Sequence, residues 1–191
     1  MTNHLIILAG GASSRMKKPS LSKLSEDLID QANSRSKALI LLNNRPMLDY
    51  VLYNAQQAGF QNIYIVIGNE GELFKTYYGK ERTKNQFHGL LISYVYQRIP
   101  EGRIKPFGTA DAVCQSLEQY PELQGDEFVV CNCDNLYSEK AFNLLRTNKS
   151  PNAFINYDRD ALEYPQERIA KFALTKVDRY NYLQDIIEKP T

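Results

Sequence analysis

At residues 4–16 the chain reads His4-Leu5-Ile6-Ile7-Leu8-Ala9-Gly10-Gly11-Ala12-Ser13-Ser14-Arg15-Met16. A short apolar run that ends at two glycines is typical of a buried strand followed by a turn. Glycine lets backbone N–H groups approach a ligand that a Cβ would exclude, and the hydroxyls and guanidinium that follow add donors and a positive charge. The stretch predicts a strand and a loop suited to the phosphates of a nucleoside triphosphate, although a turn with solvated polar residues has the same pattern.

Composition restricts the class of protein. The 191 residues are enough for one α/β domain with a buried core, and 23 basic against 22 acidic residues give a net charge of only +1. We therefore expect neither nucleic acid nor a membrane surface as a partner. The apolar runs are far shorter than the ~20 residues of a membrane span, and the amino terminus lacks the features of a signal peptide.

The chain has three cysteines, Cys114, Cys131 and Cys133. We interpret the spacing of the last two, within one apolar strand, as placing them on opposite faces of a sheet. An odd number of thiols without metal-ligand spacing indicates neither a disulfide framework nor a zinc site. Together with the missing export signal, this predicts a cytoplasmic protein.

Apolar runs alternate with helical periodicities along the chain. Strands are predicted at residues 4–8, 37–42, 62–68, 90–96, 127–133 and 153–157, with further candidates at 169–177 and 182–188. Helices are predicted at 46–59, 70–78, 109–120 and 138–146, with Thr109 and Ser138 as N-caps. This alternation predicts an α/β fold, a Rossmann-like, mostly parallel sheet with helices on both faces in a three-layer sandwich.

The segment 17–36 interrupts this order. It is rich in serine and charged residues, and its apolar residues recur at helical spacing, which predicts an amphipathic helix inserted beside the glycine loop. A lid, a partner contact and a solvated excursion are all compatible with this pattern.

Three polar clusters fall where predicted strands end. They are the Gly10 loop, Gln97 and Asp134. The carboxyl ends of parallel strands meet at one edge of the sheet, which is where such folds bind ligands. The loop lacks the lysine of a P-loop and the glycine triplet of a dinucleotide-binding loop, so the site is of another phosphate-binding type.

Five motifs resemble, in the same order, those of the sugar-phosphate nucleotidyltransferases, which make nucleotide sugars such as UDP-glucose, dTDP-glucose and GDP-mannose. The motifs are Leu8 to Met16, Lys37 with Ala38 to Tyr50, Gly108-Thr109-Ala110-Asp111-Ala112, Cys133-Asp134-Asn135 and Glu188-Lys189-Pro190. The resemblance covers nearly the whole chain and includes the glucose-1-phosphate thymidylyltransferases and uridylyltransferases. It implies that an oxygen of a sugar 1-phosphate attacks the α-phosphorus of a nucleoside triphosphate, with Mg²⁺ as cofactor and pyrophosphate as leaving group.

The resemblance implies roles for individual residues. The nucleotide-binding set would be Leu8, Gly10, Gly11, Ser13, Ser14, Gln97, Gly108 and Thr109. Arg15 would hold the departing pyrophosphate, and Lys37 would act on the phosphates near the reacting centre. Lys23 competes for that second role, but only Lys37 is followed by the matching apolar segment.

The resemblance also implies a metal ligand and sugar contacts. Asp134 would bind Mg²⁺, while Glu188 and Lys189 would hold the sugar hydroxyls and the sugar phosphate. Each of these residues also has a purely structural interpretation. Asp134 could cap the turn before Ser138, Lys37 could be a solvated residue at the start of a strand, and Glu188-Lys189 could be a charged strand end.

Three features depart from the family pattern. Cys133 stands where the family usually has glycine, the segment 17–36 is inserted, and the sequence stops at Thr191, before the second metal-binding aspartate of family members. We therefore expect one catalytic domain over residues 1–191, truncated at its C-terminus. A catalytically inactive nucleotide-binding regulatory or partner subunit on the same fold is the alternative, and the base, the sugar or alcohol phosphate and the oligomeric state, including a homo-oligomer, stay open.

Overall fold

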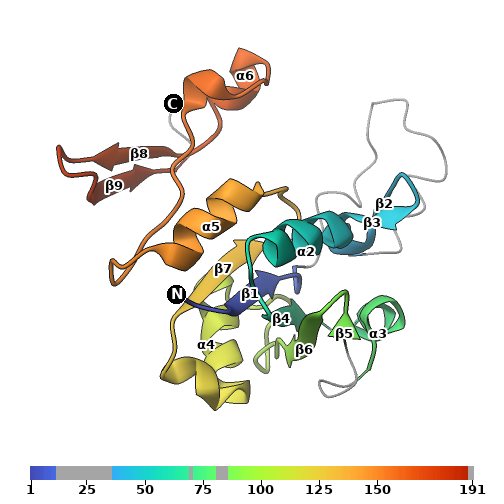
Figure 1. Ribbon diagram of the computed structural model, residues 1–191. Coiled ribbons are helices and arrows are strands. Elements are labelled where there is room, and N and C mark those ends of the chain that lie inside the picture. Colours follow the sequence, from blue (N-terminus) through green and yellow to red (C-terminus); the bar gives the residue numbers. More distant parts are fainter. Residues whose placement is uncertain (12–35, 69–70, 81–85, 189–191) are drawn as a thin grey trace. The chain divides into compact units, whose positions relative to one another are not determined.

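The computed structural model describes residues 1–11, 36–68, 71–80 and 86–188 (Figure 1). The contacts between residues divide the chain into two compact units, Met1–Pro151 and Asn152–Thr191. None of the helices in these described ranges is long and apolar enough to cross a membrane. The segment predicted as an insertion at 17–36 lies, apart from Ser36, outside the described residues.

The first unit is built on one sheet with the strand order β5-β6-β4-β1-β7. Its parallel strands are β1 (His4–Leu8), β4 (Asn62–Ile67), β6 (Leu90–Tyr96) and β7 (Phe128–Asn132). The two-residue strand β5 (Gln86–Phe87) runs antiparallel to β6 at the edge. Parallel strands buried on both faces have continuous apolar sequences, which is why the sequence identified them.

Helices cover both faces of this sheet (Figure 1). The helices α2 (Met47–Gln57), α3 (Gly71–Tyr78) and α5 (Glu139–Thr147) contribute to one buried cluster with one side of the strands. The helix α4 (Thr109–Gln119) and the 3-10 turn η2 (Pro121–Gln124) pack with the alternate strand residues on the other side. The α/β class with helices on both faces is therefore confirmed.

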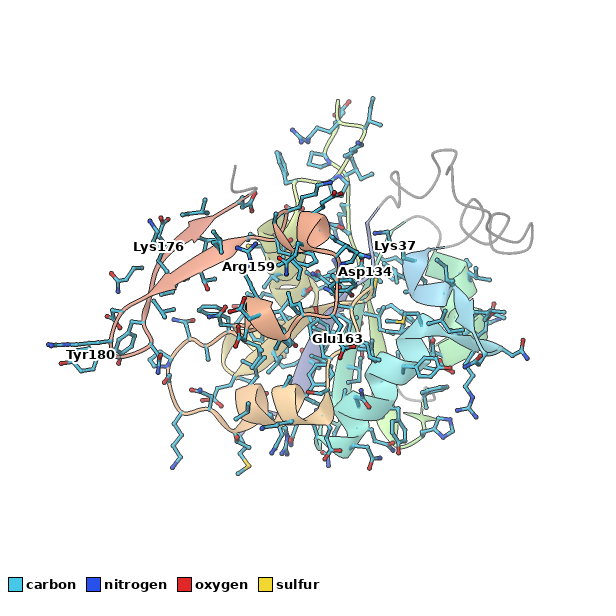
Figure 2. The ribbon with its side chains drawn as sticks, turned by 90° about the horizontal axis from the view of Figure 1, so that it is seen from above. Lys37, Asp134, Arg159, Glu163, Lys176 and Tyr180 are labelled. Carbon is cyan, nitrogen blue, oxygen red and sulfur yellow. The ribbon has the colours of Figure 1, made fainter. Side chains whose placement is uncertain are left out.

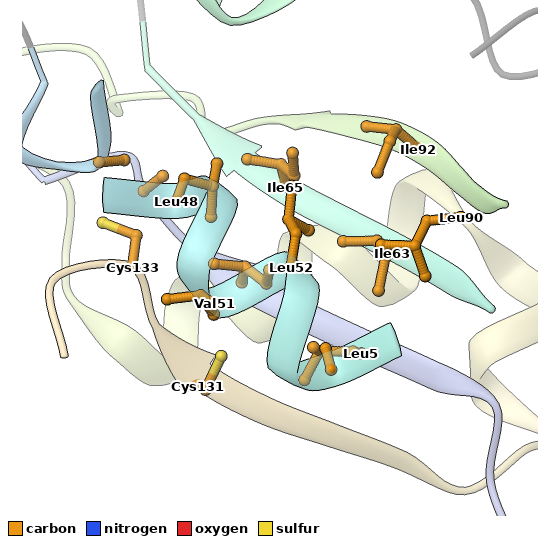
Figure 3. Close-up of a cluster of buried hydrophobic side chains, with 14 of the residues drawn as sticks. Leu5, Leu48, Val51, Leu52, Ile63, Ile65, Leu90, Ile92, Cys131 and Cys133 are labelled. Atoms are coloured by element: carbon orange, nitrogen blue, oxygen red, sulfur yellow. The ribbon is translucent and has the colours of Figure 1, made fainter. Parts of the chain in front are cut away.

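Figure 3 shows the larger cluster, where Leu48, Val51 and Leu52 of α2 pack over the sheet. Cys131 and Cys133 belong to this same cluster. Because side chains alternate along a strand, residues two apart share a face, so the expectation of opposite faces is wrong. Burial raises the pKa of both thiols, that of Cys133 to about 12.

The segment predicted as a strand at 37–42 has a different structure. Residues Lys37–Leu39 form a 3-10 turn, η1, and β2 (Leu41–Leu42) pairs with β3 (Arg45–Pro46) in a small hairpin. Its turn residues, Asn43 and Asn44, both have positive φ angles, as a tight hairpin turn requires. Ala38 and Leu39 are fully buried in the core, so their apolar character reflects packing rather than pairing within the sheet.

The second unit contains the 3-10 turn η3 (Arg159–Ala161), the short helix α6 (Gln166–Ile169) and the hairpin of β8 (Leu174–Val177) and β9 (Leu183–Ile187). The predicted strand at 153–157 is wrong, because this segment has no regular structure and four of its five residues are exposed. The strands predicted at 169–177 and 182–188 are shorter than expected. A run of apolar residues does not by itself separate a strand from an extended segment.

The burial of the thiols predicts how the folded protein reacts with a maleimide. Near pH 8 a thiol with a pKa of about 12 is ionised in roughly one molecule in 10,000, and the thiolate is the reactive form. We expect one rapid adduct by intact mass, at exposed Cys114, and three adducts in urea. The variant Cys114→Ser should give no rapid adduct, and fast modification of Cys133 in the folded protein would contradict the packing described above.

Candidate active site

A pocket of about 370 Å³ opens at the carboxyl ends of the parallel strands. In the sheet, β6, β4 and β1 follow one another in reverse chain order, and β7 lies on the other side of β1. The strand order therefore reverses between β1 and β7, and in open α/β sheets ligands bind at such a point. The pocket is lined by residues that follow β1 and β7, together with the start of α4.

The pocket brings together the described residues that the sequence analysis assigned to the nucleotide, the metal and the phosphates. These are Leu8, Gly10, Gly11, Lys37, Gln97, Gly108, Thr109 and Asp134. Ser13, Ser14, Arg15 and Lys189 lie outside the described residues, as does Lys23. Glu188 follows β9 in the second unit, where it is exposed, and its sugar-binding role stays a prediction.

Lys37 and Asp134 form an ion pair within the pocket wall. The Lys37 Nζ donates to Asp134 Oδ2 at 2.9 Å, and Figure 2 shows the two side chains together. Lys37 opens η1 and Asp134 follows β7, so the pair joins residues 97 positions apart. Because the side chains are 32% and 38% exposed, solvent screens the attraction and both groups are open to a ligand.

The cap of the following helix is independent of Asp134. The Ser138 hydroxyl accepts a hydrogen bond from the Ala141 N–H, as predicted, and so closes the start of α5. In the described part of the chain the Asp134 carboxylate instead bonds to Lys37. This arrangement favours a functional interpretation of Asp134 over a turn cap.

Gln97 approaches Gly10 closely. A Cβ at Gly10 would lie 2.6 Å from Gln97 Oε1, whereas at Gly11 it would meet nothing within 4 Å. Gln97 is buried, and its backbone N–H donates to the Ile67 carbonyl at 2.9 Å. The side chain of Gln97 therefore reaches across the end of β4 to the glycine loop, and the amide forms part of the pocket wall.

The start of α4 forms another wall of the pocket. Gly108 is the N-cap, with a φ of 139° that favours glycine, and because glycine has no side chain the N-cap residue itself cannot cap the helix. Thr109 is the first helical residue, so its predicted role as the cap is wrong. An uncapped helix start presents backbone N–H groups and the positive end of the helix dipole, which favour an anionic or polar ligand.

Sequence reasoning missed two glutamines that tie α4 to the end of β6. Gln115 bonds to the backbone of Arg98, and Gln119 bonds to the backbone of Tyr96. Their spacing of four residues, on one side of a helix, is the signal that could have identified them. Both bond to neighbours of Gln97 and so help to fix its backbone.

The donors at the pocket fit a Mg²⁺ ion that arrives with a phosphate ligand. Asp134 offers one hard carboxylate, and Mg²⁺ is commonly held by one or two carboxylates with phosphate oxygens and water completing its shell. Within the described ranges, no group of three or more His, Cys, Asp and Glu residues could hold a metal by themselves. The pocket therefore suits a metal shared with a nucleotide rather than a protein-only metal site.

Comparison with known proteins assigns the family. A family model described as a MobA-like NTP transferase domain matches residues 5–164. The chain belongs to this family. The matched range includes β1, the glycine loop, Lys37, Gln97, the start of α4 and Asp134, so it covers the whole pocket of the first unit.

Relatives with known names are nucleotidyltransferases of sugar-nucleotide type. The domain is 26% identical to the D-glycero-alpha-D-manno-heptose 1-phosphate guanylyltransferase of Aneurinibacillus thermoaerophilus, over 69% of this chain and 46% of that protein. It is 23% identical to the low-salt glycan biosynthesis nucleotidyltransferase Agl11 of Haloferax volcanii, over 97% of this chain and 44% of that protein. The expected resemblance is confirmed, and the chain spans less than half the length of these two relatives.

Solved structures show the same fold. A UDP-glucose pyrophosphorylase complexed with UDP-glucose superposes with a TM-score of 0.66 at 16% identity, over all of this chain and 70% of that one. A UDP-glucose pyrophosphorylase from Acinetobacter baumannii gives a TM-score of 0.51 at 18% identity, over 70% of this chain and 46% of that one. At these identities the likeness establishes the architecture of the NTP transferase domain.

The contact at Gly10 predicts a loss of stability in the absence of any ligand. Gly10→Ala places a methyl group against Gln97 Oε1, the far end of a flexible side chain, so we expect the amide to rotate away at a cost of about 0.5–1.5 kcal/mol. Gly125→Ala is the matched control, because its Cβ would meet nothing within 4 Å, and we expect a change within about 0.5 kcal/mol. Urea unfolding measures both free energies, and equal values for the two variants would contradict the close approach of Gln97.

Proposed function

We propose that this domain transfers a nucleoside monophosphate from a nucleoside triphosphate to a sugar 1-phosphate, or to a similar small phosphate such as an alcohol phosphate, and releases pyrophosphate. The observation that carries the proposal is the pocket in which a glycine loop, a lysine, a carboxylate and an amide converge at the switch point of the sheet. Membership of the NTP transferase family and the names of the relatives support it.

The lining of the pocket suits both parts of a nucleotide. Gln97 can both donate and accept hydrogen bonds, and with the first turn of α4 it suits the edge of a base. The glycine loop, with Lys37 nearby, suits the phosphates, and we propose that Ser13, Ser14 and Arg15 extend this binding site. A nucleotide bound in this direction would present its α-phosphorus near Lys37 and Asp134.

In the proposed reaction, an oxygen of the sugar phosphate forms a bond to the α-phosphorus. The bond from the α-phosphorus to the bridging oxygen breaks, and its electron pair leaves with pyrophosphate. Two anions must meet in line, so the protein has to supply position and positive charge. Holding the reactants at attack distance can lower the barrier by roughly 7–11 kcal/mol, and cations on the phosphates stabilise the charge that develops.

Lys37 and Asp134 would each contribute positive charge at the phosphates, Lys37 directly and Asp134 through a bound metal ion. The Lys37 ammonium is a compact charge with three donors, so it can bond to phosphate oxygens when a nucleotide enters. Asp134 would hold Mg²⁺, which when bound would neutralise phosphate charge. We propose that Glu188 and Lys189 bind the sugar hydroxyls and the sugar phosphate. The ion pair of Lys37 and Asp134 keeps both groups at the pocket before ligands bind.

A direct assay tests the proposal. The full-length protein is incubated with each common nucleoside triphosphate, a panel of sugar 1-phosphates and alcohol phosphates, and Mg²⁺, while pyrophosphate and the nucleotide product are measured. Pyrophosphate that appears only with a matched pair of substrates supports the transferase. Nucleotide binding without release across the panel contradicts it and favours the alternative of a regulatory or partner subunit on the same fold.

Removing the Lys37 charge should reduce turnover without unfolding the protein. We expect Lys37→Ala to lower the rate by at least about tenfold, and Arg15→Ala likewise, because each removes a charge that the transition state uses. Lys140→Ala, an exposed lysine on α5, is the matched control and should keep full activity. The assignment fails if Lys37→Ala turns over at the rate of the unmodified protein.

Replacing the proposed metal ligand should change the response to Mg²⁺. Asp134→Asn keeps the shape of the side chain but removes its charge, and we expect the Mg²⁺ concentration for half-maximal activity to rise about tenfold. Asp126→Asn is the control, since Asp126 pairs with His4 at the start of β1, the opposite end of that strand from the pocket. Overlaying Mg²⁺ titrations for Asp134→Asn and the unmodified protein would remove Asp134 from the metal site.

A further inference from the structure

Among the described residues, β5 covers only the start of the outer edge of β6. In the part of the chain that the structure describes, β5 pairs with β6 only at Leu90 and Leu91, while β4 pairs with the inner edge from Leu91 to Tyr96. Toward the end of β6, side chains rather than a described strand bond to the outward backbone groups.

Three side chains of α4 and its C-cap form these bonds. The Tyr120 hydroxyl donates to the Tyr94 carbonyl at 2.9 Å. Gln119 accepts from the Tyr96 N–H at 2.9 Å and donates to the Tyr96 carbonyl at 3.0 Å. Gln115 accepts from the Arg98 N–H at 2.7 Å and donates to the Arg98 carbonyl at 3.1 Å. Both backbone groups of Tyr96 and Arg98, and the carbonyl of Tyr94, thus bond to side chains of this segment.

Gln115 holds Arg98, the last of the three tethered residues. Its amide oxygen and both amide hydrogens take part in hydrogen bonds. It is buried, and its second Nε2 hydrogen donates to Asp111 Oδ2 at 2.9 Å. Residues 97–100 have no regular structure, so Arg98 already lies beyond the end of the strand. The Gln97 N–H is fixed on the inner side by Ile67, and Gln115 fixes the next residue on the outer side.

We propose that Gln115 is a positioning residue that sets the base preference of the nucleotide pocket by holding Gln97. This inference rests on the proposed function. Gln97 contributes its amide to the pocket, and Gly108 and Thr109 of the same pocket belong to the start of the helix that carries Gln115. One helix therefore sets the distance between the two groups that face the base.

The physical reason is directional. An amide discriminates between ring edges only if its donor and acceptor meet matching groups at hydrogen-bond distance and angle. Without the Gln115 bonds, the backbone at Arg98 is free to move outward, and the Gln97 amide then reads several bases with similar strength. Bonds to the phosphates come from other elements, so chemistry at the α-phosphorus should change little.

The experiment compares Gln115→Met with Tyr120→Phe. Methionine matches glutamine in size but removes all three hydrogen bonds, whereas Tyr120→Phe removes a tether of the same helix that lies three residues from Gln97. Dissociation constants of ATP, CTP, GTP, UTP and dTTP are measured by calorimetry, and kcat and KM are measured for each triphosphate that reacts. If Gln115→Met does not fold, Gln115→Asn is used, because its shorter amide cannot span both Arg98 groups.

For Gln115→Met we expect the affinity ratio between the preferred base and the next to fall about tenfold. The kcat at saturating nucleotide should stay within about threefold while KM rises, and Tyr120→Phe should keep the ratio of the unmodified protein. An unchanged ratio in Gln115→Met, or an equal fall in Tyr120→Phe, overturns the positioning role alone. No binding of any triphosphate by the unmodified protein overturns the proposed function, and the positioning role with it.

Discussion

The burial of β1 between two parallel neighbours is the constraint on which the rest of the first unit depends. Its residues are hydrogen-bonded on both edges and covered by helices on both faces. The pairing continues beyond the strand, because the Ala9 N–H donates to Val66 at 2.9 Å and the Cys133 N–H donates to the Leu8 carbonyl at 3.2 Å. These two bonds fix where the glycine loop begins and how far Asp134 lies from it.

The sequence predicted the parallel strands and the helices of the first unit. Parallel strands buried on both faces require continuous apolar runs, so β1, β4, β6 and β7 stood out, and their polar ends marked the edge of the site. Lys37 was expected at the phosphates, and the structure places it beside Asp134 in the pocket. Its local structure was not predicted, because Ala38 and Leu39 are buried by packing and not by pairing. A short apolar run results both from burial in the core and from pairing in a sheet, so the sequence does not separate the two.

Other features could not be predicted because they depend on distances across the chain. Gly10 was expected to make room for a ligand, and in the structure the atom that a Cβ there would meet first is Gln97 Oε1. The hydrogen bonds of Gln115 and Gln119 join side chains to distant backbone groups. A sequence pattern does not show which backbone group a glutamine side chain will contact. The prediction of a strand at 153–157 was wrong for a related reason, since strand formation needs a partner strand as well as apolar residues.

The glutamines on α4 also have a consequence for the solubility of the protein. An unpaired sheet edge is a template onto which another polypeptide can add as a strand, and this is a common route to aggregation. At the end of β6 the Gln119 amide bonds to the backbone of Tyr96, and just beyond the strand the Gln115 amide bonds to the backbone of Arg98. A foreign strand would have to displace these amides before it could pair with Tyr96 or Arg98.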